Sequence, residues 1–410
     1  MKERMFVIPG SFVPYNDTVT LLTYKRLRNL DLDMDVFAFK GQEDKSLLQE
    51  LNNDSNYKKF STKYMCDYDD AIAIKHPSRI FKSIYLMNKY VKEALNEFEK
   101  KNYKYLFTSS VPGISHICGK RIKAKHPEIV WYASFSDPIK GSPYKKDPYI
   151  INENIIERIV FKVGSFLYMN NKYEEAAIMN ADKLIFICEE QRDFTISQYP
   201  NLNKNELLKK SIIMPLTYIK DWNIYKEMID KNHVSNKPIK AVHLGRLYGL
   251  RRIDTFLLAL KELKQEDPTI ENKIEFHQYS EIQSSDVKKI KEYGLENLFI
   301  LHNKVSYNES TSIMKEADAL ILFDTLMPNE PNQPYLPSKI VEYLLLRKPI
   351  LGICDKNSPS YRILSKYGFN TIGSNVEAIK TNIKSIISSQ KVNDYNLDEL
   401  NSDNYYMLKL

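Results

Sequence analysis

The sequence has little cysteine, and its cysteines form no close pair. The four are Cys66, Cys118, Cys188 and Cys354 in a chain of 410 residues, and no C-x-x-C motif occurs. This spacing argues against a zinc site and is typical of cytosolic thiols that stay reduced. We therefore expect a cytoplasmic protein whose cysteines carry no chemistry.

Long hydrophobic runs are also missing. The first residues, MKERMFVIPGSF, lack the apolar stretch and the small-residue cleavage site of a signal peptide. A run such as residues 319–323 (ALILF) ends at Asp324 and is far shorter than the roughly 20 residues that cross a bilayer. Export and membrane spanning are therefore not expected, and such runs are predicted to be buried strands.

Charge of one sign is only weakly in excess. There are 59 Lys and Arg against 52 Asp and Glu, a formal net charge of +7, which is mild for a dedicated nucleic-acid binder. No RNA- or DNA-binding motif accompanies the charge, so no nucleic-acid partner is expected. The 43% of hydrophobic residues is enough for a sizeable core in one or two domains.

Short apolar runs alternate with helical stretches along the chain, which is typical of a parallel α/β sheet with helices on both faces. We predict an N-terminal Rossmann-like domain over residues 1–220, a polar linker near 230–238, a second such domain over 235–390 and a C-terminal tail, 391–410, that packs back on the first domain. Strands are expected at residues 5–8, 35–39, 105–108, 129–133, 183–187 and 212–215, and then at 240–244, 273–277, 298–301, 319–323 and 349–353.

A basic segment with two glycines, residues 243–254 (HLGRLYGLRRID), joins an expected strand to an expected helix. The strand runs into Gly245, and a turn with a second glycine, Gly249, lets a ligand approach the backbone. Three arginines, Arg246, Arg251 and Arg252, precede the helix start and are suited to a diphosphate. The pattern predicts a diphosphate site. A solvated basic turn is the alternative.

A second segment, residues 335–344 (YLPSKIVEYL), opens another helix. Ser338 is expected to cap this helix, with Lys339 beside it. Glu342 lies one turn in, where its carboxylate can accept hydrogen bonds from the hydroxyls of a ribose. The alternative is an ordinary capped helix whose Glu342 faces solvent.

Together these segments resemble the donor-binding half of GT-B glycosyltransferases, in particular the large retaining family four (glycosyl transferases group 1). The resemblance implies two Rossmann-like doubly wound domains facing a central cleft, with a UDP- or GDP-linked sugar as donor substrate and no other cofactor. By position in the family's G-R-L-x-x-x-K-G-x-D stretch, Arg246 and Arg251 contact the donor diphosphate. The resemblance places further donor-binding residues at Gly10, Gly245, Asn303, Lys304, Ser338, Lys339 and Glu342.

The sequence departs from the family in the basic segment, where Arg251 stands for the Lys and Arg252 for the glycine, and at two further places. Glu342 matches the second Glu of the family's E-x7-E signature, but Pro334 stands at the position of the first Glu, which normally contacts the transferred sugar, and Glu330 is out of register. The first loop, which contains Gly10, lacks the family's Gly-Gly pair. These departures leave the donor sugar open and motivate an alternative function, a non-catalytic GT-B-like partner of an active glycosyltransferase. A nucleotide-sugar epimerase is a third possibility.

In the N-terminal half, Asp137 follows an expected strand at a position where the resemblance puts a residue near the acceptor and the reacting centre. It would orient the acceptor hydroxyl or stabilise positive charge at the anomeric carbon, although an Asp before Pro138 also caps turns. His116 also follows a strand and is the second acceptor-binding candidate, with a purely structural role as its alternative. The Asp31-x-Asp33 pair is better explained as the solvent-facing side of a strand, so no metal site is expected.

Positive charge is concentrated between residues 75 and 146, where 15 Lys and Arg stand against 5 Asp and Glu. Within it, a long amphipathic helix is expected over residues 79–101, with Phe81, Ile84, Tyr85, Val91, Leu95 and Phe98 on one face. Such a region suits peripheral contact with an anionic membrane at the inner face of the cell membrane, and so a lipid-linked acceptor. The Lys, Asn and Ile richness of AT-rich bacterial genomes is an equally good account. The overall prediction is a retaining transferase of bacterial surface polysaccharide or glycoconjugate synthesis that acts on a glycan, lipid-linked or protein-linked acceptor.

Overall fold

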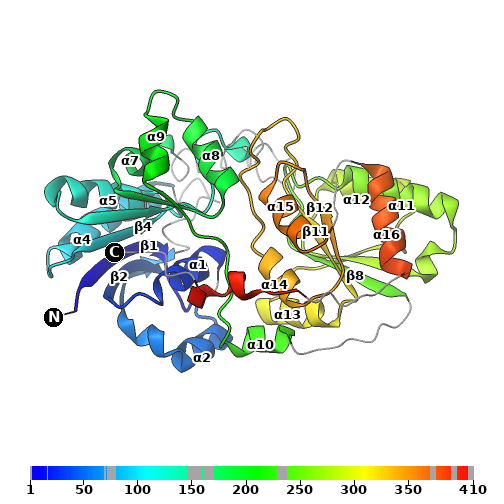
Figure 1. Cartoon of the computed structure of the whole chain (residues 1–410), viewed down its shortest axis with the longest axis horizontal. Coiled ribbons are helices and arrows are strands. Elements are labelled where there is room, and N and C mark those ends of the chain that lie inside the picture. The colour runs from blue at the N-terminus through cyan, green and yellow to red at the C-terminus, as the bar shows by residue number, and fades with distance from the viewer. Residues whose placement is uncertain are drawn as a thin grey trace. The chain divides into compact units, whose positions relative to one another are not determined.

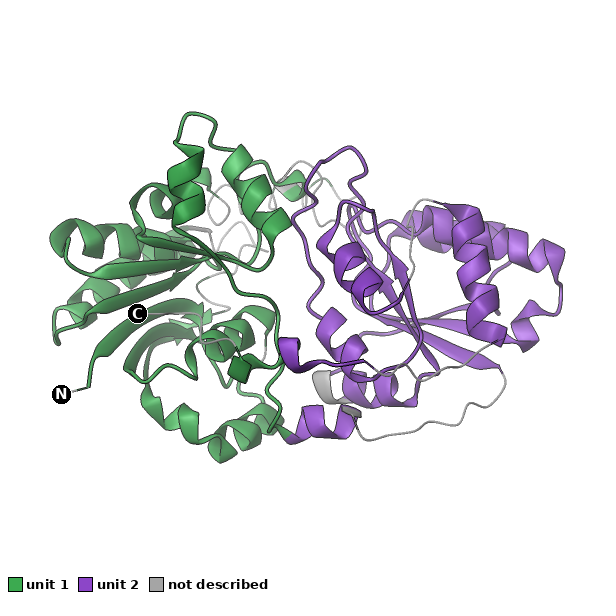
Figure 2. Ribbon diagram, viewed as in Figure 1, with its two compact units in different colours: residues 1–148, 155–222, 400–410 green, residues 149–154, 223–399 purple. Residues whose placement is uncertain are grey.

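The computed structural model describes residues 2–15, 17–68, 71, 80–145, 155, 159, 170–229, 238–369, 375–388 and 395–404. The chain divides into two compact units, coloured separately in Figure 2. Unit 1 comprises residues 1–148, 155–222 and 400–410, and unit 2 comprises residues 149–154 and 223–399. Most of the expected linker, residues 230–237, lies outside the described residues, as does Asn16 in the first loop.

Unit 1 is built on a seven-stranded parallel sheet in the order β3-β2-β1-β4-β5-β6-β7. Val7 of the first strand lies opposite Val36 on one neighbouring strand and opposite Phe107 on the other. The strands are β1 (Arg4–Ser11), β2 (Asp33–Lys40), β3 (Phe60–Asp67), β4 (Tyr105–Ser109), β5 (Val130–Ser134), β6 (Lys183–Phe186) and β7 (Ser211–Ile213). The helices are α1 (Thr18–Leu27), α2 (Lys45–Asn53), α4 (Ile80–Phe98), α5 (Ile114–Lys125), α7 (Asn171–Asn180), α8 (Glu189–Ser197) and α9 (Lys204–Lys209) (Figure 1).

The helices of unit 1 begin where local sequence favours it. Asp17 caps α1 by accepting the backbone N–H groups of Val19 and Thr20, and the Thr20 hydroxyl completes a capping box. Asp44 caps α2 in the same way through the N–H groups of Ser46 and Leu47. A side-chain oxygen at this position satisfies donors that the first turn leaves unpaired, so it fixes the start of the helix.

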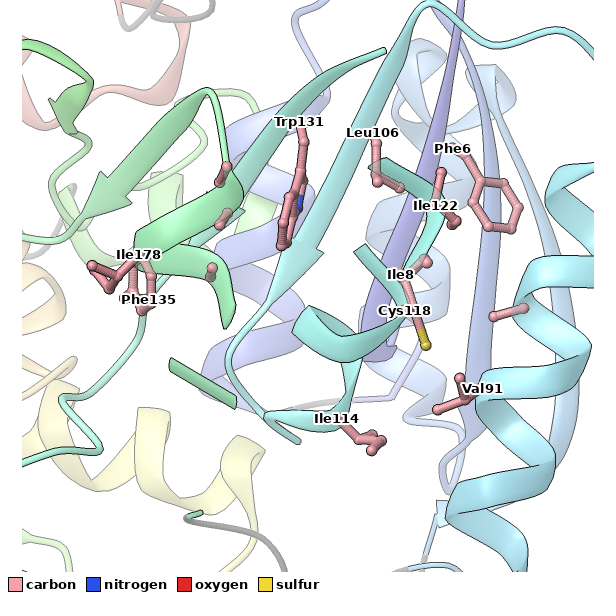
Figure 3. Close-up of a cluster of buried hydrophobic side chains, with 14 of the residues drawn as sticks. Phe6, Ile8, Val91, Leu106, Ile114, Cys118, Ile122, Trp131, Phe135 and Ile178 are labelled. Carbon is pink, nitrogen blue, oxygen red and sulfur yellow. The ribbon is translucent and has the colours of Figure 1, made fainter. Parts of the chain in front are cut away.

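The core of unit 1 lies between the sheet and the helices α4, α5 and α7. Figure 3 shows Cys118 and Ile122 of α5 among Phe6 and Ile8 of β1 and Val91 of α4. Gly119 of α5 packs on Trp131, since a Cβ at this glycine would lie 2.4 Å from the indole ring. The helix therefore approaches the sheet as closely as a residue without a side chain allows.

Unit 2 is built on a five-stranded parallel sheet in the order β10-β9-β8-β11-β12. Its strands are β8 (Ile239–Leu244), β9 (Ile274–Tyr279), β10 (Phe299–His302), β11 (Ala319–Phe323) and β12 (Ile350–Ile353). Its helices are α10 (Asn223–Ile229), α11 (Asp254–Glu266), α12 (Ser284–Glu292), α13 (Tyr307–Glu316), α14 (Ile340–Leu345), α15 (Pro359–Lys366) and α16 (Val376–Ser388). Phe256 and Leu260 of α11 and Ile383 of α16 belong to one apolar core with Phe276 and Phe323 of the sheet.

The predicted strands are present within a few residues of their expected bounds. β3 was not predicted; it is the edge strand of the first sheet, and its alternating half-exposed residues (FSTKYMCD) give no continuous apolar run. Of the expected tail, residues 395–404 are described, and Ser402 and Tyr218 are joined by a 2.8 Å backbone hydrogen bond. No helix among the described residues is long and apolar enough to cross a membrane.

Candidate nucleotide site and the loops of unit 1

Unit 2 has its topological switch point between β8 and β11, because the chain moves from β8 outward to β9 and β10 and then returns to β11 on the other side. Ligands of open parallel α/β sheets bind outside the carboxyl ends of the strands at such a point. Gly245 follows β8 there, and Asp324 follows β11. The predicted donor segments therefore lie at the edge of the sheet where this fold binds ligands.

Gly245 turns the chain at the end of β8. It has a φ of +151°, and its carbonyl oxygen accepts a 2.8 Å hydrogen bond from the side-chain amide of Gln278. A Cβ at this position would meet nothing nearer than the Nε2 atom of His243, at 3.5 Å. The space in front of this backbone is consequently open to a ligand group.

His243, at the penultimate position of β8, is buried beneath this turn. Its Nδ1 lies 2.9 Å from the carbonyl oxygen of Ile321, which can only accept, so Nδ1 carries the proton. Burial, together with the nearby charges of Arg251 and Lys339, lowers the pKa of His243 to about 3, so the ring is neutral near pH 7. Its Nε2 is then a hydrogen-bond acceptor, buried and without a partner. Sequence reasoning missed this residue because a histidine inside a strand has no motif of its own.

Arg246 and Lys304 both act on the carboxylate of Glu281, Arg246 through a salt bridge and Lys304 through its charge. The Nε of Arg246 lies 3.3 Å from a carboxylate oxygen of Glu281, with both side chains about half exposed. Slight burial opposes ionisation, but a hydrogen bond from Ser280 and the charges of Arg246 and Lys304 lower the pKa of Glu281. The ends of β8, β9 and β10 thus share one patch of two cations and one carboxylate. Asn303, next to Lys304, is exposed after β10.

Arg251 lies in the turn before α11, where its guanidinium stands 5.5 Å from the centre of the Tyr248 ring. It also interacts electrostatically with Asp324, which is almost completely buried after β11. Burial raises the pKa of Asp324 to about 6, an effect that the positive charge of Arg251 partly offsets. The carboxyl group of Asp324, which the sequence patterns did not single out, therefore lies near Arg251, one of the cations predicted to bind the diphosphate.

The start of α14 differs from the prediction at Ser338. The helix begins at Ile340 with Lys339 in the capping position and no side-chain cap, so Ser338 lies in the preceding turn and does not cap the helix. Tyr343 of this helix is buried, and its hydroxyl accepts the backbone N–H of Leu244 at 3.4 Å. This hydrogen bond joins α14 to the end of β8.

Glu342 precedes Tyr343 on α14 and is half-buried. Its Oε2 atom is buried and has no hydrogen-bond partner. A buried carboxylate oxygen without a donor costs free energy unless a ligand supplies one, and the hydroxyls of a ribose are such donors. The solvent-facing alternative for Glu342 does not fit this burial.

The segment that carries Pro334 is held by its neighbour Gln333. The Gln333 side chain donates to the carbonyl of Thr325 at 2.8 Å and accepts the backbone N–H of Tyr335 at 2.5 Å. Pro334 itself is buried, and Glu330 belongs to a turn closed by its N–H bond to the carbonyl of Met327. An amide in the core of the loop thus organises the segment in which the family has its first Glu.

In unit 1, the topological switch point lies between β1 and β4, and Gly10 lies there, near the end of β1. Gly10 has a φ of +85°, and a Cβ there would lie 2.2 Å from Cδ of Pro112 and 2.5 Å from the carbonyl oxygen of Val111. This glycine is required for the packing of two loops against each other. Any backbone contact with a donor would be additional to that structural role.

Asp137 is exposed in the bend after β5, and the residues on both sides of it are anchored. The backbone N–H of Ser136 donates to the Ser110 hydroxyl at 3.0 Å. On the other side, the N–H groups of Ile139 and Lys140 donate to the buried carboxylate of Glu174 at 2.5 and 3.2 Å. The loop therefore presents Asp137 from a fixed backbone.

His116 is completely buried in α5. Its Nδ1 lies 2.7 Å from the Thr108 hydroxyl, which also accepts the indole N–H of Trp131 at 2.9 Å. Burial lowers the pKa of His116 to about 3. In this position the ring contributes to the core, in keeping with the structural alternative.

The structure therefore brings together Gly245, Arg251 and Lys339 around His243, and Arg246 and Lys304 around Glu281, all in unit 2. Asp137, Gly10 and His116 belong to unit 1. Among the described residues, no group of three or more His, Cys, Asp or Glu side chains is arranged to hold a metal ion. Asp31 of the D-x-D pair forms a 2.7 Å salt bridge with Lys2.

No protein-family model matches the sequence, and no curated protein matches it at a significant level. Solved structures match the fold along nearly the whole chain. An E. coli structure described as trehalose-6-phosphate bound with UDP-2-fluoro glucose has a TM-score of 0.60 and 10% identity, covering 95% of this chain and 92% of that one. An α,α-trehalose-phosphate synthase (UDP-forming) from Burkholderia xenovorans, in complex with glucose-6-phosphate, has a TM-score of 0.55 and 9% identity, covering 98% and 97%.

A third match is the lipopolysaccharide outer core galactosyltransferase WaaB, with a TM-score of 0.51 and 14% identity, covering 94% of this chain and 90% of that one. These similarities confirm the predicted fold class. The chain has the α/β architecture of GT-B glycosyltransferases, with two parallel sheets flanked by helices. At such low identity the likeness extends to the fold alone.

Proposed function

We propose that this protein is a glycosyltransferase that binds a UDP- or GDP-linked sugar in unit 2 and transfers the sugar to an acceptor with retention of anomeric configuration. One observation carries the proposal. At the switch point of unit 2, the cations Arg246, Arg251 and Lys339 accompany two buried acceptors without partners, His243 Nε2 and Glu342 Oε2. Cations and hydrogen-bond acceptors in one place suit a ligand that is both anionic and rich in hydroxyl groups, as a nucleotide-sugar is.

Each residue has a role in this proposal. Arg246 and Arg251 neutralise the diphosphate, so that negative charge on the leaving group is stabilised as the glycosidic bond breaks. The carboxylate of Glu342 accepts hydrogen bonds from the hydroxyls of the ribose. His243 Nε2, as an acceptor under Gly245, binds a hydroxyl or N–H of the donor. By resemblance to retaining family four, the departing phosphate takes the acceptor's proton on the same face, with no enzyme nucleophile.

The acceptor is assigned to unit 1, where Asp137 is the candidate that orients the acceptor hydroxyl. A glycan, a lipid-linked sugar or a protein-linked sugar fits an exposed carboxylate on a fixed loop. The glucose-6-phosphate in the Burkholderia xenovorans structure adds a sugar phosphate to the acceptors to be screened. We place the reaction in bacterial surface polysaccharide or glycoconjugate synthesis.

The test is thermal stabilisation of the purified protein by UDP, GDP and ADP, since a ligand that binds only the folded state raises the apparent stability. We expect one nucleotide to raise the melting temperature, and this effect to disappear in Arg246→Ala and in Glu342→Ala. Lys288→Ala, which removes an exposed cation of α12 in the same unit, is the matched control and retains the response. The stabilising nucleotide then selects the donors for a transfer assay with retention read from the product's anomeric configuration.

Three outcomes are distinguishable. Nucleotide binding with transfer supports the proposal, and inversion in the product would refute retention. Binding without transfer or hydrolysis for any donor would favour the non-catalytic partner, for which Pro334 in place of the first Glu is the motivating observation. No response to any nucleotide would overturn the donor site itself.

A further inference from the structure

The long helix α4 changes character along its length. Its second half is buried in unit 1, with Met87, Tyr90, Val91, Ala94 and Phe98 in the core. The first turns instead expose large apolar side chains, namely Phe81 at 81%, Tyr85 at 64% and Ile84 at 37% of their full areas. The six apolar residues expected on one face are thus divided between the core and the surface.

The exposed residues form one patch. Positions i, i+3 and i+4 of a helix lie on the same side, so Phe81, Ile84 and Tyr85 are neighbours on the outer surface of two successive turns. Single exposed hydrophobic residues are ordinary, but a contiguous apolar group that includes two aromatic rings marks an interaction surface. We call these three residues the α4 patch.

Lysines border the α4 patch. Lys82 and Lys89 lie along one side of the patch, and Lys92 lies two helical turns beyond Tyr85. All three lysines are exposed. No acidic side chain occurs in the described residues of α4 before Glu93, which lies 3.6 Å from Lys89. The surrounding region, residues 75–146, carries 15 Lys and Arg against 5 Asp and Glu, although Lys75, Arg79 and Lys146 lie outside the described residues.

The positive charge around the α4 patch indicates which partner fits this surface. A second copy of this chain on the α4 patch would bring equal clusters of lysines together, which opposes association. A membrane with anionic lipids offers the complementary charge, and its interface accepts Phe, Ile and Tyr side chains beside the lysines. Tyr suits this depth because its ring is apolar and its hydroxyl stays hydrated.

We propose that the first turns of α4 dock unit 1 on an anionic phospholipid membrane, with the α4 patch at the boundary between head groups and acyl chains and Lys89 and Lys92 on the head groups. The helix lies on the membrane and does not cross it. This surface shares no residue with the nucleotide site of unit 2, so the inference stands independently of the proposed function. It would give a lipid-linked acceptor a shared surface with the enzyme.

The test is sedimentation of the full chain with vesicles of phosphatidylcholine alone or with 30 mol% phosphatidylglycerol. We expect at least about tenfold stronger partitioning onto the anionic vesicles, weakened by 0.5 M salt. Phe81→Ser/Tyr85→Ser and Lys89→Glu/Lys92→Glu should each lose about tenfold or more. Met179→Ser, which removes an exposed apolar residue of α7, and Lys288→Glu, which reverses an exposed charge of α12, are the matched controls and bind as the unaltered protein.

Depth is measured with Tyr85→Trp, because Trp131 and Trp222 are buried. Brominated acyl chains should quench the new indole and leave the two buried ones unaffected. Equal binding to neutral vesicles, no binding, or no quenching would overturn the proposal. So would a dimer in light scattering that Phe81→Ser/Tyr85→Ser converts to a monomer, since a second copy would then cover the patch. Melting temperatures of the variants, expected to be unchanged for exposed sites, exclude misfolding as a cause.

Discussion

The backbone N–H of Ile139 donates a 2.5 Å hydrogen bond to the carboxylate of Glu174, a fully buried residue of α7. The other carboxylate oxygen accepts the N–H of Lys140 at 3.2 Å and the hydroxyl of Tyr199 at 2.9 Å. Three donors from two other segments thus converge on one side chain. Because the first two belong to the loop after Asp137, Glu174 fixes the position of the candidate acceptor residue without contacting a substrate.

Glu174→Gln is therefore expected to impair transfer while leaving nucleotide binding intact. A glutamine has one acceptor oxygen, and its NH2 group would face a donor, so about 1–3 kcal/mol of stability is lost and the loop loosens. The expected result is a lower kcat or a higher KM for the acceptor, with an unchanged nucleotide Kd. Glu175→Gln, an exposed neighbour on the same helix, is the control. Unchanged kinetics in a folded but less stable Glu174→Gln protein would limit this residue to a stabilising role.

Arg246 and Glu281 make a second prediction, because the cation predicted to bind the diphosphate is already paired. Arg246→Ala should weaken nucleotide binding about tenfold to a hundredfold, the value of a charge-assisted hydrogen bond to phosphate. Glu281→Gln should strengthen it by about twofold to fivefold, since the half-exposed pair is weak and its removal leaves Arg246 to the ligand. Isothermal titration measures both. Weaker binding in Glu281→Gln would mean that the carboxylate positions Arg246 for the ligand.

The strands and the two donor segments could be predicted from sequence because both depend on local patterns. Apolar runs such as residues 319–323 report burial directly, and the basic turn carries Gly245 and Arg246 in one segment. β3 was missed because an edge strand buries little and alternates polar residues. The capping role assigned to Ser338 was wrong because α14 begins at Ile340, after Lys339 in the capping position. The contact between Tyr343 and Leu244 joins residues about 100 positions apart, so local spacing could not predict it.

The residues that sequence reasoning missed share a different property. His243, Glu281 and Asp324 acquire their roles from neighbours on other strands, as when Ile321 on β11 determines which nitrogen of His243 carries the proton. Neighbourhood across a parallel sheet follows from strand order, and strand order is not visible in spacing along the chain. A signal did exist for Asp324, since it follows a fully apolar strand at the edge where ligands bind.

Gly10 gives a prediction about stability. Gly10→Ala should destabilise unit 1 by about 2–4 kcal/mol, because the added Cβ meets Pro112 and the Val111 carbonyl at a positive φ. Gly141→Ala is a matched control in the same unit. Its φ is +74°, but the obstacle is the flexible end of the Gln198 side chain, so only about 1 kcal/mol is expected. Urea unfolding compares the two, and equal losses would show that the loops at Gly10 move apart at little cost.

The last prediction concerns pH. Burial raises the pKa of Asp324 to about 6, and burial together with the charge of Asp254 raises the pKa of Asp286 to about 6 as well. A carboxyl whose pKa is higher in the folded state than its ordinary value of 3.8 binds more protons when folded, so its stabilising contribution is complete below about pH 4 and is lost as the pH rises through about 6. In Asp324→Asn the neutral amide stays in place at every pH. The variant should therefore gain stability over the unaltered protein between pH 4.5 and 6.5, up to about 3 kcal/mol.

Asp286→Asn should show the same trend independently, and Asp221→Asn, at an exposed site, should show none. Urea unfolding across this range measures the differences, and a gain for Asp324→Asn that does not grow with pH would show that this carboxyl is already ionised in the folded protein at pH 4.5.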